Sequence, residues 1–439
     1  MRVWVKVVGI VVAVLVVGLV GVYWWQRPML LTGTGYAAHN ACAVTHIAGR
    51  DNPDADLPGN PLVPVLRTQA TEAGADSTIL GLLARQRAWL TQGFGCTIAA
   101  QAPTLPAPTP VDATANPYLS APEPTEDAAV QAALDNAFGA DLDDAGRAAL
   151  GTRGVVVLSH GELVAEQYAD GFDASTPQLG WSMSKSLANL LAGRLVAEGQ
   201  VSLDDDHLRP EWTDERASIT VRQLLQMTSG LAWDETYDLN TPITRMLYLE
   251  PDMAGYVASQ PLAHQPGTHL QYSSGSTTLL CAILAAGRGG ADLPRRELFG
   301  PLGLASMVME TDGAGTPVCS SYAWATPRDW AAVGQFALAD GVWNGTRMLP
   351  EGWMADSTTA VDVESEEDGY ASGWWANQRA DGTLRFPGLP ADTYFAIGHD
   401  GQWLTVVPSA ELVVVRMGFT PEADEQADRL TGELLAALG

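Results

Sequence analysis

Lysine is almost absent from this sequence. Of its 24 basic residues, 22 are arginine, and the two lysines are Lys6 and Lys185. The 51 acidic residues outnumber the basic ones and give a formal net charge of −27. A protein that binds nucleic acid needs a basic surface to neutralise phosphates, so this balance excludes nucleic acid as a partner. The acidity is typical of a well-solvated surface, and it leaves open why a lysine is kept at position 185.

The sequence also lacks the patterns that hold metal ions. Its four cysteines form no C-x-x-C pair, and its seven histidines are scattered. His264 and His269 are only five residues apart, but Pro266 between them prevents one helix from presenting both on the same face. We therefore expect no metal and no other cofactor. The G-x-S-x-G turn of α/β-hydrolases is missing too, because Ser184 replaces its second glycine in GWSMS.

One long hydrophobic run stands near the start of the chain. Val7–Trp25 contains 19 residues without a charge, which is long enough to cross a membrane as a helix. Arg2 and Lys6 precede it, Arg27 follows it, and its last three residues are aromatic, as in the belts of membrane helices. A cleaved signal peptide is the second interpretation, although its apolar region usually has only about 7–15 residues. We expect an uncleaved membrane anchor over residues 1–27 and a periplasmic or otherwise extracytoplasmic body.

The four cysteines have different surroundings. Cys42 and Cys96 flank the first exported segment, and an exported compartment permits them to form a disulfide. Cys281 lies in the apolar run TTLLCAILAA, where we expect it to pack as a small hydrophobic residue. Cys319 shows no such pattern, and its role stays open.

The rest of the chain divides into two parts. Residues 28–115 form an exported segment with a helix expected at about 78–90, and they run into a linker with seven prolines between positions 103 and 124. Residues 116–439 form the main domain. It opens with a helix at about 127–138 and the hairpin VVVLSHGELVAEQY. Strand patterns return only in TYFAIGHDGQWLTVVPS and ELVVVRMGF, before a last helix at about 422–438.

This order of elements predicts an α+β fold. The antiparallel sheet is built from both ends of the main domain and flanked by helices, and a mainly helical region is inserted between the two sets of strands.

The stretch GWSMSKS, residues 180–186, contains the second lysine. In a helix, residues three apart lie on the same face, so Ser182 is the one serine of the three that can use Lys185. Ser182 would also stand at the helix N-terminus, where unpaired N–H groups favour developing negative charge. Burial can lower the pKa of a lysine until it accepts a proton, whereas arginine stays charged. The spacing therefore predicts a nucleophilic Ser182 activated by Lys185.

Two further stretches carry candidate site residues. Tyr272, in HLQYSSGSTT, stands just before a Gly-Ser helix start and could pass a proton to or from the serine–lysine pair. The late stretch GHDGQW contains His399, Gly401 and Gln402. Glycine lets a substrate approach the backbone closely, and backbone N–H groups at a strand edge can bind an oxyanion. Taken alone, each stretch also has an ordinary interpretation, as a half-buried tyrosine and as a hairpin turn.

In this order, SMSK, YSS and HDG resemble the motifs of the serine β-lactamase and penicillin-binding superfamily. The resemblance covers residues 120–439 and is nearest to the branch of class C β-lactamases, D-Ala-D-Ala carboxypeptidases, family VIII esterases and 6-aminohexanoate-dimer hydrolases. It implies a β-lactamase/transpeptidase-like fold. It also implies that Ser182 forms an acyl-enzyme, that Lys185 helps to deprotonate it, and that Tyr272 is the general base and later the acid. The backbone N–H groups of Ser182 and Gln402 would form the oxyanion hole.

Two positions depart from the pattern of that superfamily. Ser274 stands where β-lactamases usually have an asparagine that holds the substrate, and His399 stands where a lysine usually binds the substrate carboxylate. We expect Ser274, His399 and Gly401 to contact the substrate.

These departures favour small esters or amides over β-lactams as substrates. The predicted function is that of a membrane-anchored serine hydrolase. One alternative is a β-lactamase or D-Ala-D-Ala carboxypeptidase, and another is a non-catalytic, membrane-tethered binding module of the same fold. The oligomeric state stays open.

Overall fold

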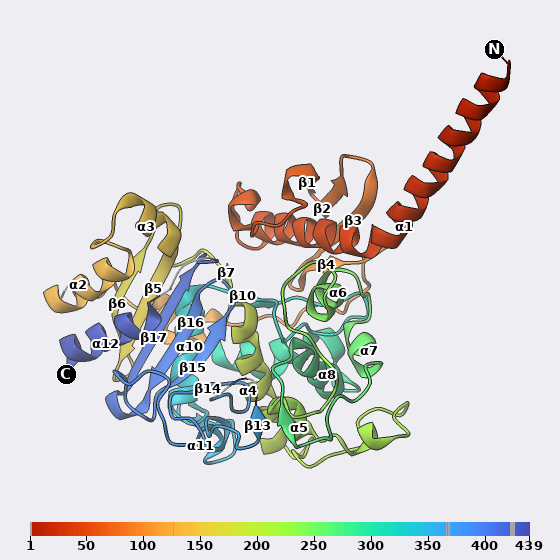
Figure 1. The fold of residues 1–439 in the computed structure, drawn as a ribbon. Helices are drawn as coiled ribbons and strands as arrows, with labels where there is room; N and C mark the ends of the chain where they lie inside the picture. Colours follow the sequence, from red (N-terminus) through yellow and green to blue (C-terminus); the bar gives the residue numbers. More distant parts are fainter. Residues whose placement is uncertain (1, 126, 366, 368, 422–425) are drawn as a thin grey trace.

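An antiparallel sheet lies at the centre of the main domain (Figure 1). The structure, a computed structural model, describes residues 2–125, 127–365, 367, 369–421 and 426–439. The six strands of this sheet are β5 (Thr152–Ser159), β6 (Glu162–Tyr168), β14 (Trp375–Ala376), β15 (Tyr394–Gly398), β16 (Gln402–Val407) and β17 (Leu412–Gly418). Their order is β14-β15-β16-β17-β5-β6, so strands from the two ends of the domain meet where β17 pairs with β5. The predicted closure of the sheet by both ends is confirmed.

Both faces of this sheet are covered by helices. On β5, Val155 and Val157 pack towards α2 (Ala128–Ala137) and α12 (Ala427–Leu438). The alternate residues Val156 and Leu158 pack into the large core that includes α10 (Pro327–Leu338). Since successive strand residues point to opposite faces, burial on both sides explains the unbroken run of valines. The expected last helix is present from residue 427, and residues 422–425 of that prediction lie outside the described residues.

The region between β6 and β14 is mainly helical, as predicted. Its helices, besides α10, are α4 (Ser184–Ala197), α5 (Val221–Leu225), α6 (Pro242–Tyr248), α7 (Met253–Ala258), α8 (Ser274–Ala285), α9 (Gly300–Leu302) and α11 (Trp353–Ser357). The short α3 (Asp144–Leu150) precedes β5. Paired strands of two or three residues link them: β7 (Gln178–Leu179), β8 (His269–Leu270), β9 (Val308–Met309), β10 (Ala323–Ala325), β11 (Val342–Trp343), β12 (Thr346–Arg347) and β13 (Glu364–Ser365). The fold is α+β, as predicted.

The segment before the main domain forms a second, smaller sheet. Its strands are β1 (Leu66–Thr71), β2 (Gly74–Ile79), β3 (Leu83–Thr91) and β4 (Gly95–Ile98), in sequence order and antiparallel. The expected helix at 78–90 is wrong, because Gly81, with φ of +81°, turns the chain back between β2 and β3. The leucines on either side of Gly81 are part of this turn and of the start of β3, not of one face of a helix.

One long helix, α1 (Arg2–His46), precedes that sheet and contacts β1, β2 and β3. It is exposed up to Trp25 and mostly buried from Leu31 onwards. Figure 1 shows its exposed half projecting from the body and bending before the buried half, and Pro28 inside the helix accounts for such a bend. Within the described residues, α1 is the one helix long and apolar enough to cross a membrane, and the mean hydropathy of its most apolar stretch of 18 residues is 2.8.

Two disulfides tie separate segments together. Cys42 of α1 is bonded to Cys96 of β4, as predicted. Cys281 of α8 packs in the main hydrophobic core, as predicted, but it is also bonded to Cys319, which was not predicted. The two cysteines are 38 residues apart and show no pattern that would have paired them.

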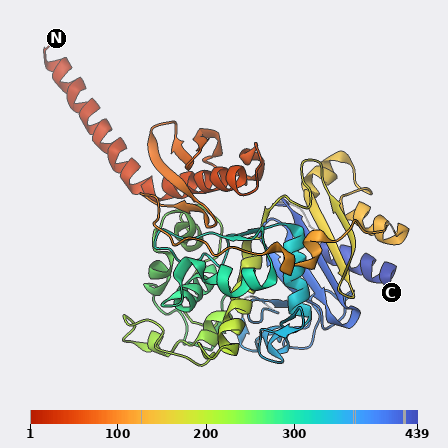
Figure 2. The same ribbon diagram turned by 180° about the vertical axis from the view of Figure 1, so that it is seen from behind.

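The proline-rich stretch runs along the surface of the main domain towards α2 (Figure 2). The structure has no strand or α-helix between Ile98 and Ala128 in the part it describes, only two short 3₁₀ turns. The backbone N–H and the hydroxyl of Thr109 both donate to the carboxylate of Asp292. The indole N–H of Trp343 donates to the carbonyl of Ala115 at 2.9 Å. The stretch is therefore fastened to the domain at intervals.

Candidate active site

Ser182 and Lys185 are in contact, as the sequence predicts. Ser182 lies in a 3₁₀ turn, Trp181–Met183, that runs directly into α4, which carries Lys185. The Nζ of Lys185 is 2.9 Å from Ser182 Oγ and also lies 2.8 Å from Ser274 Oγ and 3.0 Å from the carbonyl oxygen of Ser320. Lys185 is 2% exposed. Three oxygens therefore fix the amine at one position beside the serine.

Burial changes the protonation of Lys185. Removal from water disfavours the charged form and lowers the pKa of Lys185 to about 8, while the nearby Glu235 carboxylate acts in the opposite direction. At pH 7 about a tenth of such an amine is neutral. In the neutral form its lone pair can accept the hydrogen bond that the ammonium donates to Ser182. The pair is thus arranged for proton transfer from the serine hydroxyl.

Ser274 belongs to the hydrogen-bond network around Lys185, and its expected contact with the substrate stays a prediction. Ser274 is fully buried, and its hydroxyl donates to the Glu235 carboxylate while it accepts from Lys185. The other Glu235 oxygen accepts from the Ser274 backbone N–H at 2.8 Å and from Trp233 Nε1 at 2.6 Å. These contacts link Glu235, Ser274 and Lys185 into one chain of hydrogen bonds that ends at Ser182.

Sequence reasoning missed Glu235 altogether. It lies in the loop between α5 and α6, 39 residues before Ser274, and no spacing rule connects the two positions. The only hint in the sequence is that Glu235 lies in AWDETYD, a turn-rich stretch of the helical region.

Tyr272 also reaches the pair. Its ring centroid is 4.8 Å from Lys185 Nζ, and its side chain interacts with that of Ser182. The ring is held between Trp375, stacked at 5.4 Å, and the edge of Tyr370 at 5.3 Å. Burial raises the pKa of Tyr272 well above its ordinary value, so the phenol keeps its proton at neutral pH.

The turn between β15 and β16 places the other candidates. Gly398 lies directly against the carbonyl of Gly180, since a Cβ at Gly398 would come within 2.2 Å of that oxygen. His399 therefore stands beside the nucleophile turn, with its ring on the edge of Trp181 at 5.7 Å and stacked on Tyr237 at 4.5 Å. The ring also lines a cavity, so a substrate contact by His399 stays a prediction.

Gly401 and Gln402 are both buried behind this turn. Arg416 donates to the carbonyl of Gly401, and the side-chain amide of Gln402 is bonded to the backbone of Gly418 at 2.7 and 3.0 Å. These bonds fix the backbone at the start of β16. The oxyanion role of the Gln402 N–H and the substrate contact of Gly401 stay predictions.

Two cavities border the site. One of about 150 Å³ is lined by His399, Tyr237 and Tyr248 together with Tyr36 and residues 58–61 of the segment before the main domain. Tyr36 stacks on Tyr248 with ring centroids 4.6 Å apart, so α1 forms part of the wall. The other cavity, of about 530 Å³, is lined by Trp233, Asp234, Glu235, Thr236, Gln271, Tyr272 and Glu367. The sequence did not indicate that the first segment contributes to the site.

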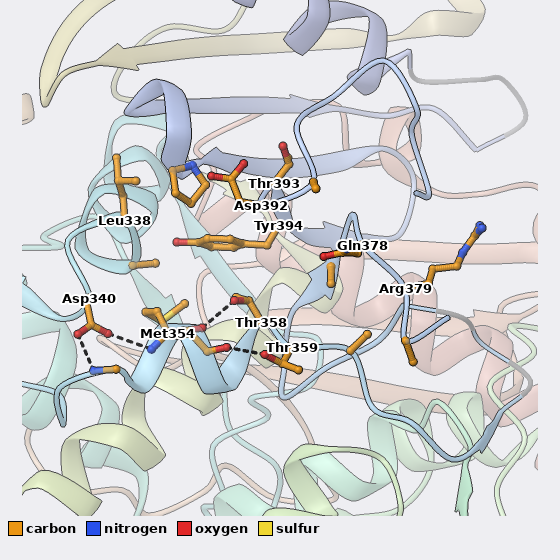
Figure 3. Close-up of a pocket in the computed structure, with 18 of the residues that line it drawn as sticks. Leu338, Asp340, Met354, Thr358, Thr359, Gln378, Arg379, Asp392, Thr393 and Tyr394 are labelled. Atoms are coloured by element: carbon orange, nitrogen blue, oxygen red, sulfur yellow. Dashed lines mark hydrogen bonds between the residues drawn. The ribbon is translucent and has the colours of Figure 1, made fainter. Parts of the chain in front are cut away.

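A further cavity, of about 850 Å³, lies away from these residues, beside Tyr394 (Figure 3). Several of its polar groups have partners within the protein: Asp340 accepts from the backbone N–H groups of Gly352 and Met354, and the hydroxyl of Thr358 donates to the carbonyl of Met354. Across the described ranges, no group of three or more His, Cys, Asp or Glu side chains is placed to hold a metal ion.

A family model described as Beta-lactamase matches residues 134–437, which is more than half of the chain. The chain belongs to the β-lactamase family. It is a serine hydrolase of the β-lactamase superfamily, and the match contains Ser182, Lys185 and Tyr272. A curated relative, the 6-aminohexanoate-dimer hydrolase of Paenarthrobacter ureafaciens, is 26% identical over 308 residues, covering 62% of this chain and 74% of that protein.

Solved structures share the fold of this β-lactamase family member at lower identity. A penicillin-binding protein homologue from Caulobacter crescentus matches with a TM-score of 0.55 and 18% identity over 72% of this chain and 99% of its own. EstCE1, a hydrolase with promiscuous acyltransferase activity, matches with a TM-score of 0.54 and 17% identity over 71% of this chain and 98% of its own.

Proposed function

We propose that this β-lactamase family member is a membrane-anchored, exported hydrolase that cleaves small esters or amides through an acyl-enzyme on Ser182. The observation that carries the proposal is the buried Lys185, whose Nζ lies 2.9 Å from Ser182 Oγ and whose pKa is lowered to about 8. The exposed apolar half of α1 supports the anchor. The two disulfides support an oxidising compartment outside the cytoplasm.

In the proposed reaction, neutral Lys185 takes the proton of the Ser182 hydroxyl as its oxygen attacks the substrate carbonyl. The backbone N–H groups of Ser182 and Gln402 stabilise the oxyanion that forms. When the carbon–oxygen or carbon–nitrogen bond breaks, the neutral phenol of Tyr272 gives its proton to the leaving group, and Lys185 restores it. Water then attacks the ester on Ser182, its proton passes back along the same groups, and the acid product leaves.

This scheme moves the role of general base from Tyr272 to Lys185 and keeps Tyr272 as the acid. The resemblance implied that Tyr272 is the general base. A partly buried phenol with a raised pKa keeps its proton at neutral pH and is a poor proton acceptor, whereas the amine with a lowered pKa is a good one. We assign the base to Lys185 and the acid to Tyr272.

Glu235 and Ser274 are proposed as positioning residues for Lys185. Ser274 Oγ lies between the amine and the Glu235 carboxylate and fixes the amine towards Ser182. The negative charge of Glu235 keeps the pKa of Lys185 from falling further. Because position 274 carries a serine in place of asparagine, the site lacks the amide that would hold a β-lactam side chain, which favours simpler esters and amides.

The proposal is tested with a fluorophosphonate probe on the full-length protein in detergent. We expect covalent labelling of the wild-type protein and none of Ser182→Ala. A panel of short-chain p-nitrophenyl esters, 6-aminohexanoate dimer, nitrocefin and a D-Ala-D-Ala peptide then defines the substrate. An unlabelled wild-type protein, under conditions where a related hydrolase reacts, would favour the non-catalytic binding module. Rapid turnover of nitrocefin or the peptide alone would favour the β-lactamase or carboxypeptidase alternative.

Replacing Glu235 by glutamine should move the pH dependence of acylation. In the wild type we expect kcat/KM to rise with pH through an apparent pKa of about 8, as Lys185 loses its proton. The carboxylate stabilises the ammonium, so Glu235→Gln lowers the pKa of Lys185 and shifts the rising limb to lower pH. The measurement is a pH profile of kcat/KM with a p-nitrophenyl ester.

The matched control for this change is Asp234→Asn, which removes a charge from the exposed neighbour in the same loop. We expect its profile to match that of the wild type. A Glu235→Gln profile that keeps its midpoint, or that moves to higher pH, would contradict the role of Glu235 on Lys185.

A further inference from the structure

Three exposed leucines form the tip of the β2–β3 hairpin. Leu80 is 59% exposed, Leu82 86% and Leu83 43%, and we call residues 80–83 the leucine tip. Among the described residues, the other large hydrophobic side chains exposed to this degree lie on α1, apart from Leu438 at 38%. Exposed apolar side chains gathered at one place mark a surface that meets a partner or a membrane.

The leucine tip is held beside the exposed half of α1. The backbone N–H of Ala84, the residue after the tip, donates to the hydroxyl of Tyr23 at 3.3 Å. The carbonyl of Ala84 accepts from Thr34 Oγ1 at 2.7 Å, on the buried half of α1. Both bonds fix the tip at the level where α1 leaves the body of the protein.

The same level of α1 carries the residues of a membrane interface. Trp24 and Trp25 are 62% and 77% exposed, and the guanidinium of Arg27 lies 5.3 Å from the ring of Trp24. Tryptophan and arginine are typical of the zone between hydrocarbon and water. The exposed apolar surface of α1 runs from Trp4 to Trp25 and ends beside the leucine tip.

We propose that the leucine tip inserts into the interface of the membrane that α1 crosses. The inference rests on the proposed anchor and goes beyond it, because it gives the body a second contact with the bilayer. A lipid surface is favoured over a second copy or another protein because the tip continues the apolar surface of α1 at the height of its tryptophans. Two contacts prevent the body from rotating about α1 and hold the cavity beside Tyr36 in one orientation to the membrane.

The test uses full-length protein in vesicles of phosphatidylethanolamine and phosphatidylglycerol. All four cysteines are in disulfides, so a single introduced thiol takes a fluorescent NBD label alone. For Leu82→Cys we expect blue-shifted emission and quenching of at least about twofold by lipids that carry a doxyl group near the headgroup. Leu438→Cys is the matched control, because it is an exposed leucine at the opposite end of the protein from the start of α1 (Figure 1). It should show water-like emission.

A label at Val12→Cys in α1 separates the tip from the anchor. Quenching at Val12 with water-like, unquenched emission at Leu82 would overturn the inference and leave the anchor intact. Absence of quenching at both positions would overturn the inference and the proposed anchor. Blue-shifted emission at Leu82 that lipid quenchers do not reach, and that disappears when the protein is diluted with lipid, would identify a protein contact and also overturn it.

Discussion

Lys185→Arg should lose catalysis almost completely although it keeps the positive charge. We expect a fall of about 10⁴-fold or more in the rate of acylation, the scale for removing the base from an activated nucleophile. Arginine cannot give up its proton in a protein, so it offers Ser182 no acceptor. The measurement is the pre-steady-state burst of p-nitrophenol from a short-chain ester, together with fluorophosphonate labelling.

The sequence has one other lysine, Lys6, and its replacement by arginine is the control for Lys185→Arg. Lys6→Arg makes the same change outside the site and should leave the burst unchanged. Because a larger side chain at a buried position can disturb folding, Lys185→Met serves as a second variant that removes the amine without adding bulk at its end. Both variants should keep the wild-type near-ultraviolet circular dichroism. A burst close to wild type in either folded variant would contradict the role of Lys185 as base.

Tyr272→Phe should slow hydrolysis according to the leaving group. For an amide or an alkyl ester, whose leaving group needs a proton, we expect a loss of about 10²-fold or more in kcat/KM. For a p-nitrophenyl ester the loss should be much smaller, because p-nitrophenolate is stable without a proton. Comparing kcat/KM for the two kinds of substrate isolates the acid from any general damage to the site.

Tyr370→Phe is the matched control for this variant. Its ring packs against that of Tyr272, with centroids 5.3 Å apart, and shares its aromatic surroundings, but within the described residues no hydrogen bond joins its hydroxyl to Ser182 or Lys185. It should lose little activity and show no dependence on the leaving group. If Tyr272→Phe lost equal kcat/KM on both kinds of substrate, Tyr272 would have a packing role and not that of the acid.

How much of the site could be predicted from the sequence depended on how far apart in the chain the interacting residues lie. The contact of Ser182 with Lys185 follows from a spacing of three residues at a helix start, so it could be predicted. Ser274 and Glu235 meet across 39 residues and through a loop, and nothing in the local pattern joins them. The hydrogen bonds of Ser274 to Lys185 and Glu235 were therefore not predicted, even though the position of Ser274 in the YSS motif was recognised.

The same limit explains the errors in the smaller sheet and in the disulfides. The run STILGLLARQRAWL has the apolar content of a helix, but Gly81 reverses the chain, and pairing with β1 and β4 decides the outcome. Such pairing depends on strands outside the stretch, and tertiary context overrides local propensity there. The bond between Cys281 and Cys319 likewise depends on the folded arrangement of α8 and the segment before β10.

The Cys281–Cys319 bond joins two segments that hold the amine of Lys185. Cys281 shares α8 with Ser274, and Cys319 is followed by Ser320, whose carbonyl accepts from Lys185 at 3.0 Å. Two of the three oxygens around the amine are thus joined by a covalent link that forms only where thiols are oxidised. In the proposed exported enzyme we therefore expect formation of the Cys281–Cys319 bond to be an oxidation step that helps to hold Ser274 and Ser320 around Lys185.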